Sequence, residues 1–195
     1  QPRLIRQVAE QFQTGALVAL PTDASYVLAC HLEDRTAVDR MRQLRGIDEK
    51  HLLTLLCRDL SELSQYAQVD NRQFRFLKEW TPGAYTFILP ATREVPRRLM
   101  HPSRKTVGLR VPEAPIVQAL LAELGVPLLC ASLILPGDED PLSDPDDIED
   151  RIGKRIDLLV DGGAGQLEAT SVIDVTGDEP VIQRVGLGPV EAMLR

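Results

Sequence analysis

The chain has 195 residues, of which 44% are hydrophobic and 26% charged, values that are ordinary for a soluble globular protein. It contains no run of about 18 apolar residues and no signal-peptide pattern, so we expect no membrane span and a cytoplasmic location. The cysteines Cys30, Cys57 and Cys130 stand far apart without metal-binding spacing, and we expect them to be reduced core thiols. The length suits a single domain over residues 1–195 with a sizeable core.

The net charge of −7 by itself argues against a nucleic-acid ligand, but the charge is unevenly distributed. Residues 138–150 hold eight acids and no base, and without those eight negative charges the net charge of −7 becomes +1. Residues 93–110 hold six bases against one acid. We expect the acidic segment to form an exposed loop and then a helix capped by Asp144, beside a basic groove that suits a polyanionic ligand such as a nucleotide.

The hydrophobic pattern predicts short strands interleaved with helices along the whole chain. In the first half we expect helices over 4–12, 35–44, a short stretch after Asp59, and 71–80, with strands over 16–20, 26–30, 52–57 and 85–89. In the second half we expect a helical turn over 95–100, helices over 115–125 and 144–152, a last short helix after Pro189, and strands over 106–111, 127–132, 157–160, 171–175 and 181–184. The first two strands are too close for a helical crossover, so the predicted class is α/β with a mixed sheet.

The central part of this pattern is a strand that carries Arg110, a helix that packs back, and a second strand that delivers Ser132 into a Pro-Gly loop. We interpret it as a βαβ unit with polar groups at two strand ends, where ligands bind in open α/β sheets. An arginine inside an apolar strand is costly to bury unpaired, so Arg110 requires a carboxylate, either internal or from a ligand. Thr106 lies on the same face of that strand as Arg110.

Other polar positions are ambiguous when they are taken singly. Thr22 follows a strand end and either offers a hydroxyl to a small ligand or merely belongs to a turn. Thr170 and Arg184 lie at the ends of the final strands, and each either contacts a ligand or has only a structural role. A cationic group surrounds Gly46 and consists of Arg42, Arg45, Lys50 and His51. These side chains either bind phosphate oxygens or form a solvated helix face. The sequence holds no P-loop motif and no Ser-His-Asp arrangement, and its three histidines predict no metal site.

Together, several short segments resemble the YrdC/YciO superfamily of threonylcarbamoyl-AMP synthases, and within it most closely the YciO subgroup. The matching segments are 21–26, 82–86, 106–112, 131–132, 161–163, 170–172 and 184–186. They occur in the family's order and extend over nearly the whole chain. The resemblance implies a single domain with a twisted, open mixed sheet flanked by helices, and a concave cationic cleft.

The resemblance also implies a reaction. Threonine and bicarbonate form a carbamate, which attacks the α-phosphate of ATP and releases pyrophosphate, and the threonylcarbamoyl-AMP formed serves the modification of an adenosine in transfer RNA. ATP is thus the expected substrate, with Mg²⁺ on its triphosphate, and a small amino acid is the second substrate. An older assignment in the family implies the alternative, a module that binds double-stranded RNA or transfer RNA, or a regulatory module, without synthase activity.

Residue by residue, the resemblance assigns threonine binding to Thr22, Arg110 and Thr170, and nucleotide binding to Arg45, Thr106, Ser132 and Arg184. The basic side chains expected to meet RNA or another anion are Lys50, Arg97, Arg98, Arg104 and Lys105. Two positions depart from the family's motifs. A Lys-x-Arg motif reads Arg45-Gly46-Ile47, and a Ser-x-Asn motif reads Ser132-Leu133-Ile134. We therefore expect nucleotide binding with weakened synthesis, since isoleucine offers no hydrogen-bond donor or acceptor.

Overall fold

The structure is a computed structural model that describes residues 1–194. Its strands are β1 (Val18–Leu20), β2 (Val27–His31), β3 (Thr54–Leu56), β4 (Tyr85–Pro90), β5 (Thr106–Arg110), β6 (Leu128–Ser132), β7 (Leu158–Leu159), β8 (Ser171–Asp174) and β9 (Val181–Arg184). Its helices are α1 (Pro2–Gln13), α2 (Arg35–Arg45), α3 (Leu60–Tyr66), α4 (Asn71–Trp80), α5 (Pro115–Leu124) and α6 (Pro145–Ile152), with short 3₁₀ helices η1 (Arg97–Leu99) and η2 (Glu191–Leu194). The predicted α/β class is confirmed.

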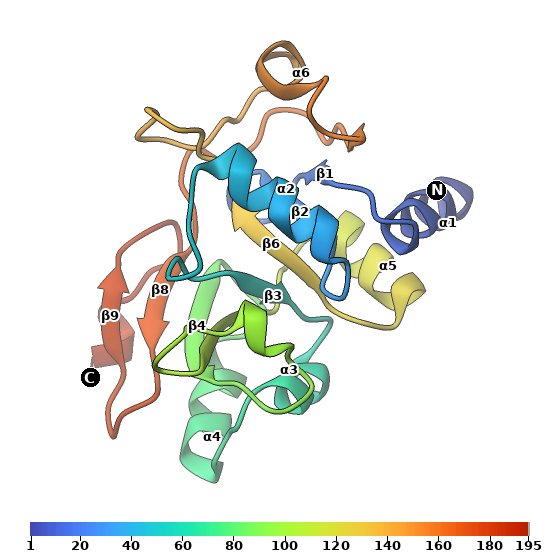
Figure 1. Ribbon diagram of the computed structural model, residues 1–195. Helices are drawn as coiled ribbons and strands as arrows, with labels where there is room; N and C mark the ends of the chain where they lie inside the picture. The colour runs from blue at the N-terminus through green and yellow to red at the C-terminus, as the bar shows by residue number, and fades with distance from the viewer. Residues whose placement is uncertain (195) are drawn as a thin grey trace.

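A single mixed sheet runs through the molecule in the strand order β7-β1-β2-β6-β3-β5-β4-β8-β9, with helices around it (Figure 1). The strands β1 and β2 pair antiparallel, as their short connection predicts. Three pairs are parallel, namely β1 with β7, β3 with β5, and β4 with β8. The remaining neighbours are antiparallel.

The expected βαβ unit around Arg110 and Ser132 is wrong. The strand β3 lies between β5 and β6, and it runs parallel to β5 but antiparallel to β6, with Thr54 opposite both Gly108 and Cys130. The two strands joined by α5 therefore run in opposite directions, and their carboxyl ends lie at opposite edges of the sheet. Arg110 and Ser132 can meet one ligand only across the face of the sheet, not at a shared edge.

The helix boundaries follow the capping signals in the sequence. The side chain of Asp34 accepts a hydrogen bond from the Ala37 amide at 2.9 Å and begins α2, which ends at Gly46 with a left-handed φ of 66°. Asp144 caps α6 in the same manner, by accepting from the Asp146 amide at 2.9 Å. These caps confirm the predicted starts of both helices and place Arg45 on the last turn of α2.

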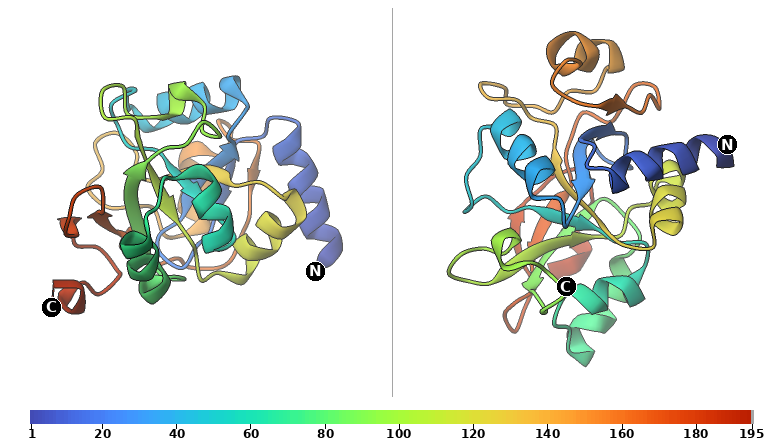
Figure 2. Two further views of the ribbon diagram at one scale, coloured as in Figure 1. Left: turned by 90° about the horizontal axis from the view of Figure 1, so that it is seen from below. Right: turned by 45° about the vertical axis from the view of Figure 1, so that its right-hand side comes forward.

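Helices cover the two faces of the sheet unequally. On one face, Met41 and Leu44 of α2 are buried in the larger core cluster, to which Leu28 and Leu55 of the sheet also belong. On the opposite face, α1 and α5 lie side by side near the N-terminus (Figures 1 and 2). Their apolar side chains cover β1, β2 and β6. The same face of β3, β5, β4 and β8 carries threonine, arginine and branched aliphatic side chains, and a cavity opens there.

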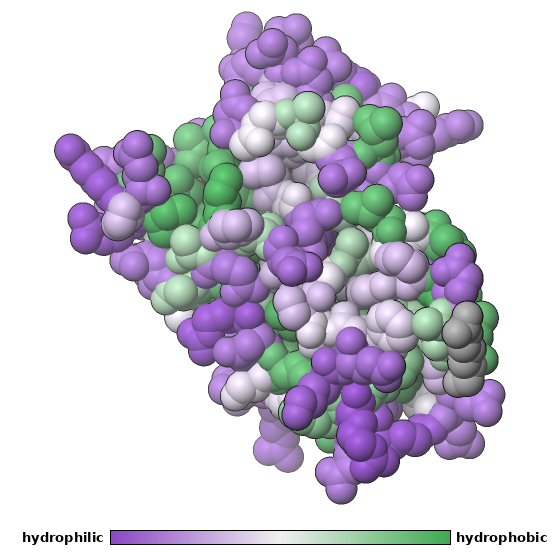
Figure 3. Space-filling model, turned by 180° about the vertical axis from the view of Figure 1, so that it is seen from behind, coloured by the Kyte–Doolittle hydropathy of each residue, from purple (hydrophilic) through white to green (hydrophobic). Residues whose placement is uncertain are grey.

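The acidic segment is anchored at two apolar positions. Leu142 and Ile148 are buried in the larger core, whereas most of the acidic side chains over residues 138–150 are exposed, as predicted. Asp138 forms an ion pair with Arg151 at 2.6 Å. Seen from behind, the α6 end of the molecule is strongly hydrophilic, and hydrophobic residues on this face occur in small groups (Figure 3). No helix within residues 1–194 is long and apolar enough to cross a membrane.

Candidate functional site

A cavity of about 360 Å³ lies on the sheet face that α1 and α5 leave uncovered. Its floor is built from strand residues, which are Thr54, Thr86, Ile88, Cys130 and Val172. Its polar and charged lining comes from Arg45, His51, Arg110, Ser132, Thr170, Gln183 and Arg184. Five of the seven residues assigned by resemblance to threonine or nucleotide thus line one cavity, although they are spread from residue 45 to residue 184.

Arg110 already has an internal carboxylate partner, which settles one of the two alternatives for its burial. Its Nη2 donates to Asp23 Oδ1 at 2.7 Å and to Thr22 Oγ1 at 3.0 Å. The side chains of Arg110 and Asp23 are only 4% and 11% exposed, so this pair is desolvated. The Nε of Arg110 is buried and has no partner within the described residues. Since Arg110 also lines the cavity, part of its guanidinium stays available to a ligand.

Thr22, assigned to threonine by resemblance, has a hydroxyl that is fully engaged within the protein. It donates to the Ser25 carbonyl oxygen at 2.8 Å, and it accepts from the Ala24 amide at 3.0 Å and from Arg110. A hydroxyl has one hydrogen to donate and two lone pairs to accept with, so no hydrogen-bonding capacity remains. Thr22 is also absent from the residues that line the cavity. In this structure its side chain holds Arg110.

Arg45 and Arg184 are fixed by backbone carbonyl groups. Arg45 donates from Nη1 to the Ser132 carbonyl oxygen at 2.6 Å, and its Nε is buried without a partner in the part of the chain described. Arg184 donates from Nε and Nη2 to the Thr170 carbonyl oxygen at 3.0 and 2.6 Å. The hydroxyl groups of Thr170 and Thr86 share a hydrogen bond of 2.7 Å. Carbonyl groups orient the two guanidinium groups without neutralising their charge.

The electrostatics of the cavity favour an anion. Burial, and then the charge of Arg184, lower the pKa of Arg45. Burial, and then the charge of Arg110, lower the pKa of Arg184. Burial and the neighbouring arginines also lower the pKa of His51 below 6.5. No acidic side chain is among the lining residues, so a bound anion would relieve the repulsion between these cations.

Cys130 lies in the floor of the same cavity but is not a candidate nucleophile. Burial raises the pKa of its thiol to about 11, although the nearby Arg110 opposes the shift. A thiol with such a pKa stays protonated near neutral pH, and the thiolate is the reactive form. All three cysteines are buried and free, which confirms the expectation of core thiols.

Thr106 and Ile47, two further positions considered in the sequence, lie outside this cavity. Thr106 is buried at the start of β5 and does not line it, so its role as a nucleotide contact stays a prediction. Of the two isoleucines that depart from the family's motifs, Ile134 lines the cavity. Ile47 packs against the core and faces a different hollow beside Arg98.

The basic residues predicted to meet RNA or another anion are dispersed. Arg97 and Lys105 line a separate cavity of about 470 Å³ together with Arg93. Arg98 donates to the carbonyl oxygens of Leu32 and Glu33, so its guanidinium holds a loop. Lys50 and Arg104 line neither cavity and are exposed. Binding of RNA by these side chains stays a prediction.

Sequence reasoning missed three residues that shape the site. Asp23 follows Thr22 directly, and a buried arginine without a nearby acid in its own strand was the signal that such a partner existed. Thr54 and Thr86 are hydroxyl-bearing residues in otherwise apolar strands, and together they form part of the cavity floor. Within residues 1–194, no group of three or more His, Cys, Asp or Glu side chains is arranged to hold a metal ion.

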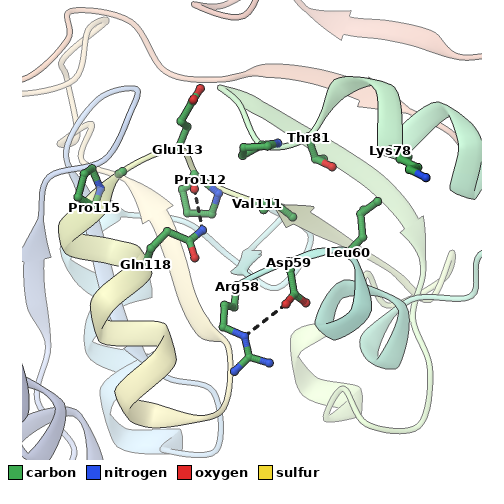
Figure 4. A pocket seen from close by; sticks show the side chains of 12 residues that line it. Arg58, Asp59, Leu60, Lys78, Thr81, Val111, Pro112, Glu113, Pro115 and Gln118 are labelled. Atoms are coloured by element: carbon green, nitrogen blue, oxygen red, sulfur yellow. Dashed lines mark hydrogen bonds and ion pairs between the residues drawn. The ribbon is translucent and has the colours of Figure 1, made fainter.

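A larger cavity of about 500 Å³ lies between α3, α4 and α5 beyond the end of β5 (Figure 4). Leu60 and Val111 supply apolar surface, while Arg58 is paired with Asp59 at 3.4 Å. Acids and bases both line it, so it lacks the excess of positive charge found in the smaller cavity. The smaller cavity is therefore the better candidate site for an anionic ligand.

Comparisons with known proteins agree on one family. The model of the Sua5/YciO/YrdC family, described as "Telomere recombination", matches residues 10–186. The chain is 50% identical to the uncharacterised protein YciO of Escherichia coli (strain K12) over 194 residues, covering 100% of this chain and 94% of that protein. It is 27% identical to the threonylcarbamoyl-AMP synthase of Vibrio vulnificus (strain YJ016) over 184 residues, covering 92% of this chain and 97% of the synthase.

Solved structures give the same result. The crystal structure of E. coli YciO superposes with a TM-score of 0.96 at 50% identity, covering 99% of this chain and 94% of that one. P. abyssi Sua5, crystallised in complex with L-threonine, superposes with a TM-score of 0.87 at 26% identity. That alignment covers 95% of this chain and 55% of the Sua5 chain. The predicted superfamily and the resemblance to YciO are confirmed.

Proposed function

The chain belongs to the Sua5/YciO/YrdC family, and on that premise we propose that its 360 Å³ cavity binds ATP together with a small amino acid and supports synthesis of threonylcarbamoyl-AMP. The observation that carries this proposal is the convergence of Arg45, Arg110 and Arg184 on one cavity whose lining holds no acid. Such a cavity suits a ligand pair that brings a triphosphate and a carboxylate. A threonylcarbamoyl-AMP synthase requires both.

The two ends of the cavity suggest different roles for the arginines. Arg45 and Arg184 are held by carbonyl groups, and the charge of Arg184 lowers the pKa of Arg45, so both would receive phosphate oxygens. Arg110 lies on the same face of the sheet as Ser132 but toward the other end of the strands, and it would receive the carboxylate of the amino acid. The relative from P. abyssi was crystallised with L-threonine, which supports an amino acid as the second substrate.

The chemistry requires little covalent work from the protein. The amine of threonine combines with bicarbonate to give a carbamate and water. A carbamate oxygen then forms a bond to the α-phosphorus of ATP while the bond to the β-phosphate oxygen breaks, and pyrophosphate leaves. The arginines hold the two reactants in line and neutralise the charge that develops on the phosphates, which is how phosphoryl-type transfers are generally accelerated.

Magnesium would come with the nucleotide. No Asp or Glu side chain lines the cavity, so the oxygens of the triphosphate and water would hold the ion, a common arrangement for Mg²⁺. When bound, the ion supplies further neutralisation of the phosphate charge. The residues of the chain contribute the orientation of the reactants.

The test is the release of pyrophosphate from ATP by the purified chain. Synthesis of threonylcarbamoyl-AMP requires that release depend on threonine and bicarbonate together, with either one omitted as the control. Pyrophosphate release that does not depend on threonine would contradict the proposed reaction. Calorimetry with AMP and with threonine separates binding from turnover, and absence of AMP binding would contradict the assignment of the cavity.

An RNA-binding module without synthase activity is the second candidate function. The cavity lined by Arg93, Arg97 and Lys105, which is separate from the proposed nucleotide site, favours it. Contacts to phosphates make RNA binding fall steeply with salt. Retention of transfer RNA that weakens with salt and with Arg97→Ala, combined with no pyrophosphate release, would support this second function over the first.

A further inference from the structure

We propose that Asp23 is a positioning residue of the site, whose carboxylate fixes the guanidinium of Arg110 so that the donors at Nη1 remain for the carboxylate of the amino-acid substrate. The proposal rests on the proposed function in one respect, namely that Arg110 receives that carboxylate. It goes further because it gives Asp23, which does not line the cavity, control over how tightly the amino acid is bound.

The geometry at Arg110 separates the donors that are used from those that are left. Both hydrogens of Nη2 are accounted for, one by Asp23 Oδ1 at 2.7 Å and the other by Thr22 Oγ1 at 3.0 Å. Nε is buried without a partner, whereas Nη1 is not among the buried atoms, and no described residue accepts from it. Nη1 is therefore the part of the guanidinium that a ligand carboxylate can reach, and an ionised acceptor makes a strong hydrogen bond with it.

Asp23 makes a second bond that fixes its own position. Its Oδ2 accepts from the Glu113 amide at 2.9 Å, so one carboxylate joins the β1–β2 loop, the end of β5 and the loop that leads into α5. Each oxygen has a separate task, and an asparagine has only one acceptor oxygen. Asp23→Asn, which has almost the same shape, therefore cannot serve both Arg110 and the Glu113 amide, and it also removes the negative charge.

The chain offers a similar arrangement far from the cavity. Asp157 accepts from Arg40 Nη1 at 2.7 Å and from the Leu17 amide at 2.8 Å, so it also joins an arginine to a backbone amide. This pair is more exposed, with side chains 35% and 41% accessible, and neither residue lines the cavity. Asp157→Asn is accordingly the matched control for losing such a carboxylate.

The experiment measures threonine and AMP affinity by calorimetry for the wild type, Asp23→Asn and Asp157→Asn. We expect Asp23→Asn to weaken threonine binding by at least about tenfold while AMP binding changes by less than about twofold, because only the carboxylate-binding arginine is released. Asp157→Asn should change neither affinity. Equal threonine affinity in the wild type and Asp23→Asn would overturn the proposal, and so would tighter binding, which would mean that Asp23 competes with the ligand.

A second measurement does not depend on the ligand. The Nε–H signal of Arg110 in ¹⁵N NMR, assigned with Arg110→Lys, should report a guanidinium with restricted rotation in the wild type and a freely rotating one in Asp23→Asn. Thr22→Val, which removes the other acceptor of Nη2, should show a smaller change in the same direction. An unchanged signal in Asp23→Asn overturns the proposal even if the wild type binds no threonine, a result that would instead contradict the proposed function.

Discussion

Thr54 on β3 closes over Gly108, its register partner on β5, so tightly that a Cβ built on the glycine would lie 2.7 Å from Thr54 Oγ1. The same Cβ would lie 3.0 Å from Thr86 Cγ2 and 3.1 Å from a methyl group of Leu52. All three side chains belong to the cavity lining. The absence of a side chain at position 108 is therefore what allows the floor of the cavity to form at this depth.

Gly108→Ala should destabilise the fold and disturb the cavity floor. Overpacking of this kind costs about 1–3 kcal/mol in the free energy of unfolding, and it should also weaken AMP binding. Gly177→Ala is the control, because a Cβ there meets no atom within 4 Å. Urea unfolding and calorimetry measure the two effects, and equal stability of the two variants would contradict this account of Gly108.

Arg110→Ala should lose both stability and amino-acid binding. The variant leaves Asp23 buried without its cation, and breaking such a buried pair costs about 3–5 kcal/mol. The lost charge-assisted bonds to a ligand carboxylate correspond to about 1.5–3 kcal/mol of binding free energy. Arg40→Ala breaks a more exposed pair and should cost only about 0–1 kcal/mol. Unchanged threonine affinity in Arg110→Ala would remove the arginine from the amino-acid site.

Ile134→Asn should raise the rate of threonylcarbamoyl-AMP synthesis. Ile134 lines the cavity, and an amide there restores a hydrogen-bonding group that the family's Ser-x-Asn motif has. A preorganised donor is typically worth a factor of ~10²–10³ in rate. Ile47→Arg serves as the comparison. Ile47 packs against the core outside this cavity, so we expect that substitution alone to leave the rate unchanged. The opposite ranking in a pyrophosphate-release assay would contradict the placement of these residues.

His51 should make stability depend on pH in the weakly acidic range. Its pKa in the folded chain lies below the ordinary value of 6.5, chiefly because of burial and then because of Arg45. As the pH falls below about 6.5 the unfolded chain takes up a proton before the folded chain does, so stability is fully present above that pH and declines beneath it. Urea unfolding between about pH 5 and 7.5 measures the decline.

His51→Gln should remove that part of the pH dependence. Added AMP should reduce the decline in the wild type, because an anion beside His51 favours the imidazolium form and raises its pKa. The same pH dependence in the wild type and in His51→Gln would show that another group causes it.

Local features of the sequence determined the elements and their ends. Asp34 and Asp144 begin helices because a side-chain oxygen can accept from a free amide two or three residues later, and Gly46 ends one because it tolerates a positive φ. The order of short motifs was sufficient for the family, which the comparisons confirm. The cost of burying a charge was likewise enough to require a carboxylate for Arg110.

Only the tertiary structure decided which groups meet. Sequence spacing favoured a parallel β5–α5–β6 unit, but β3 inserts between the two strands, and strand order depends on pairing between residues far apart in the chain. The carboxylate partner of Arg110 is Asp23, 87 residues away in the sequence, and the hydroxyl of Thr22 accepts a hydrogen bond from the same Nη2 group. Hydrogen bonds tolerate deviations of only a few tenths of an ångström in the donor–acceptor distance. The distances between remote segments follow from packing of the whole sheet and its helices, which no local pattern encodes.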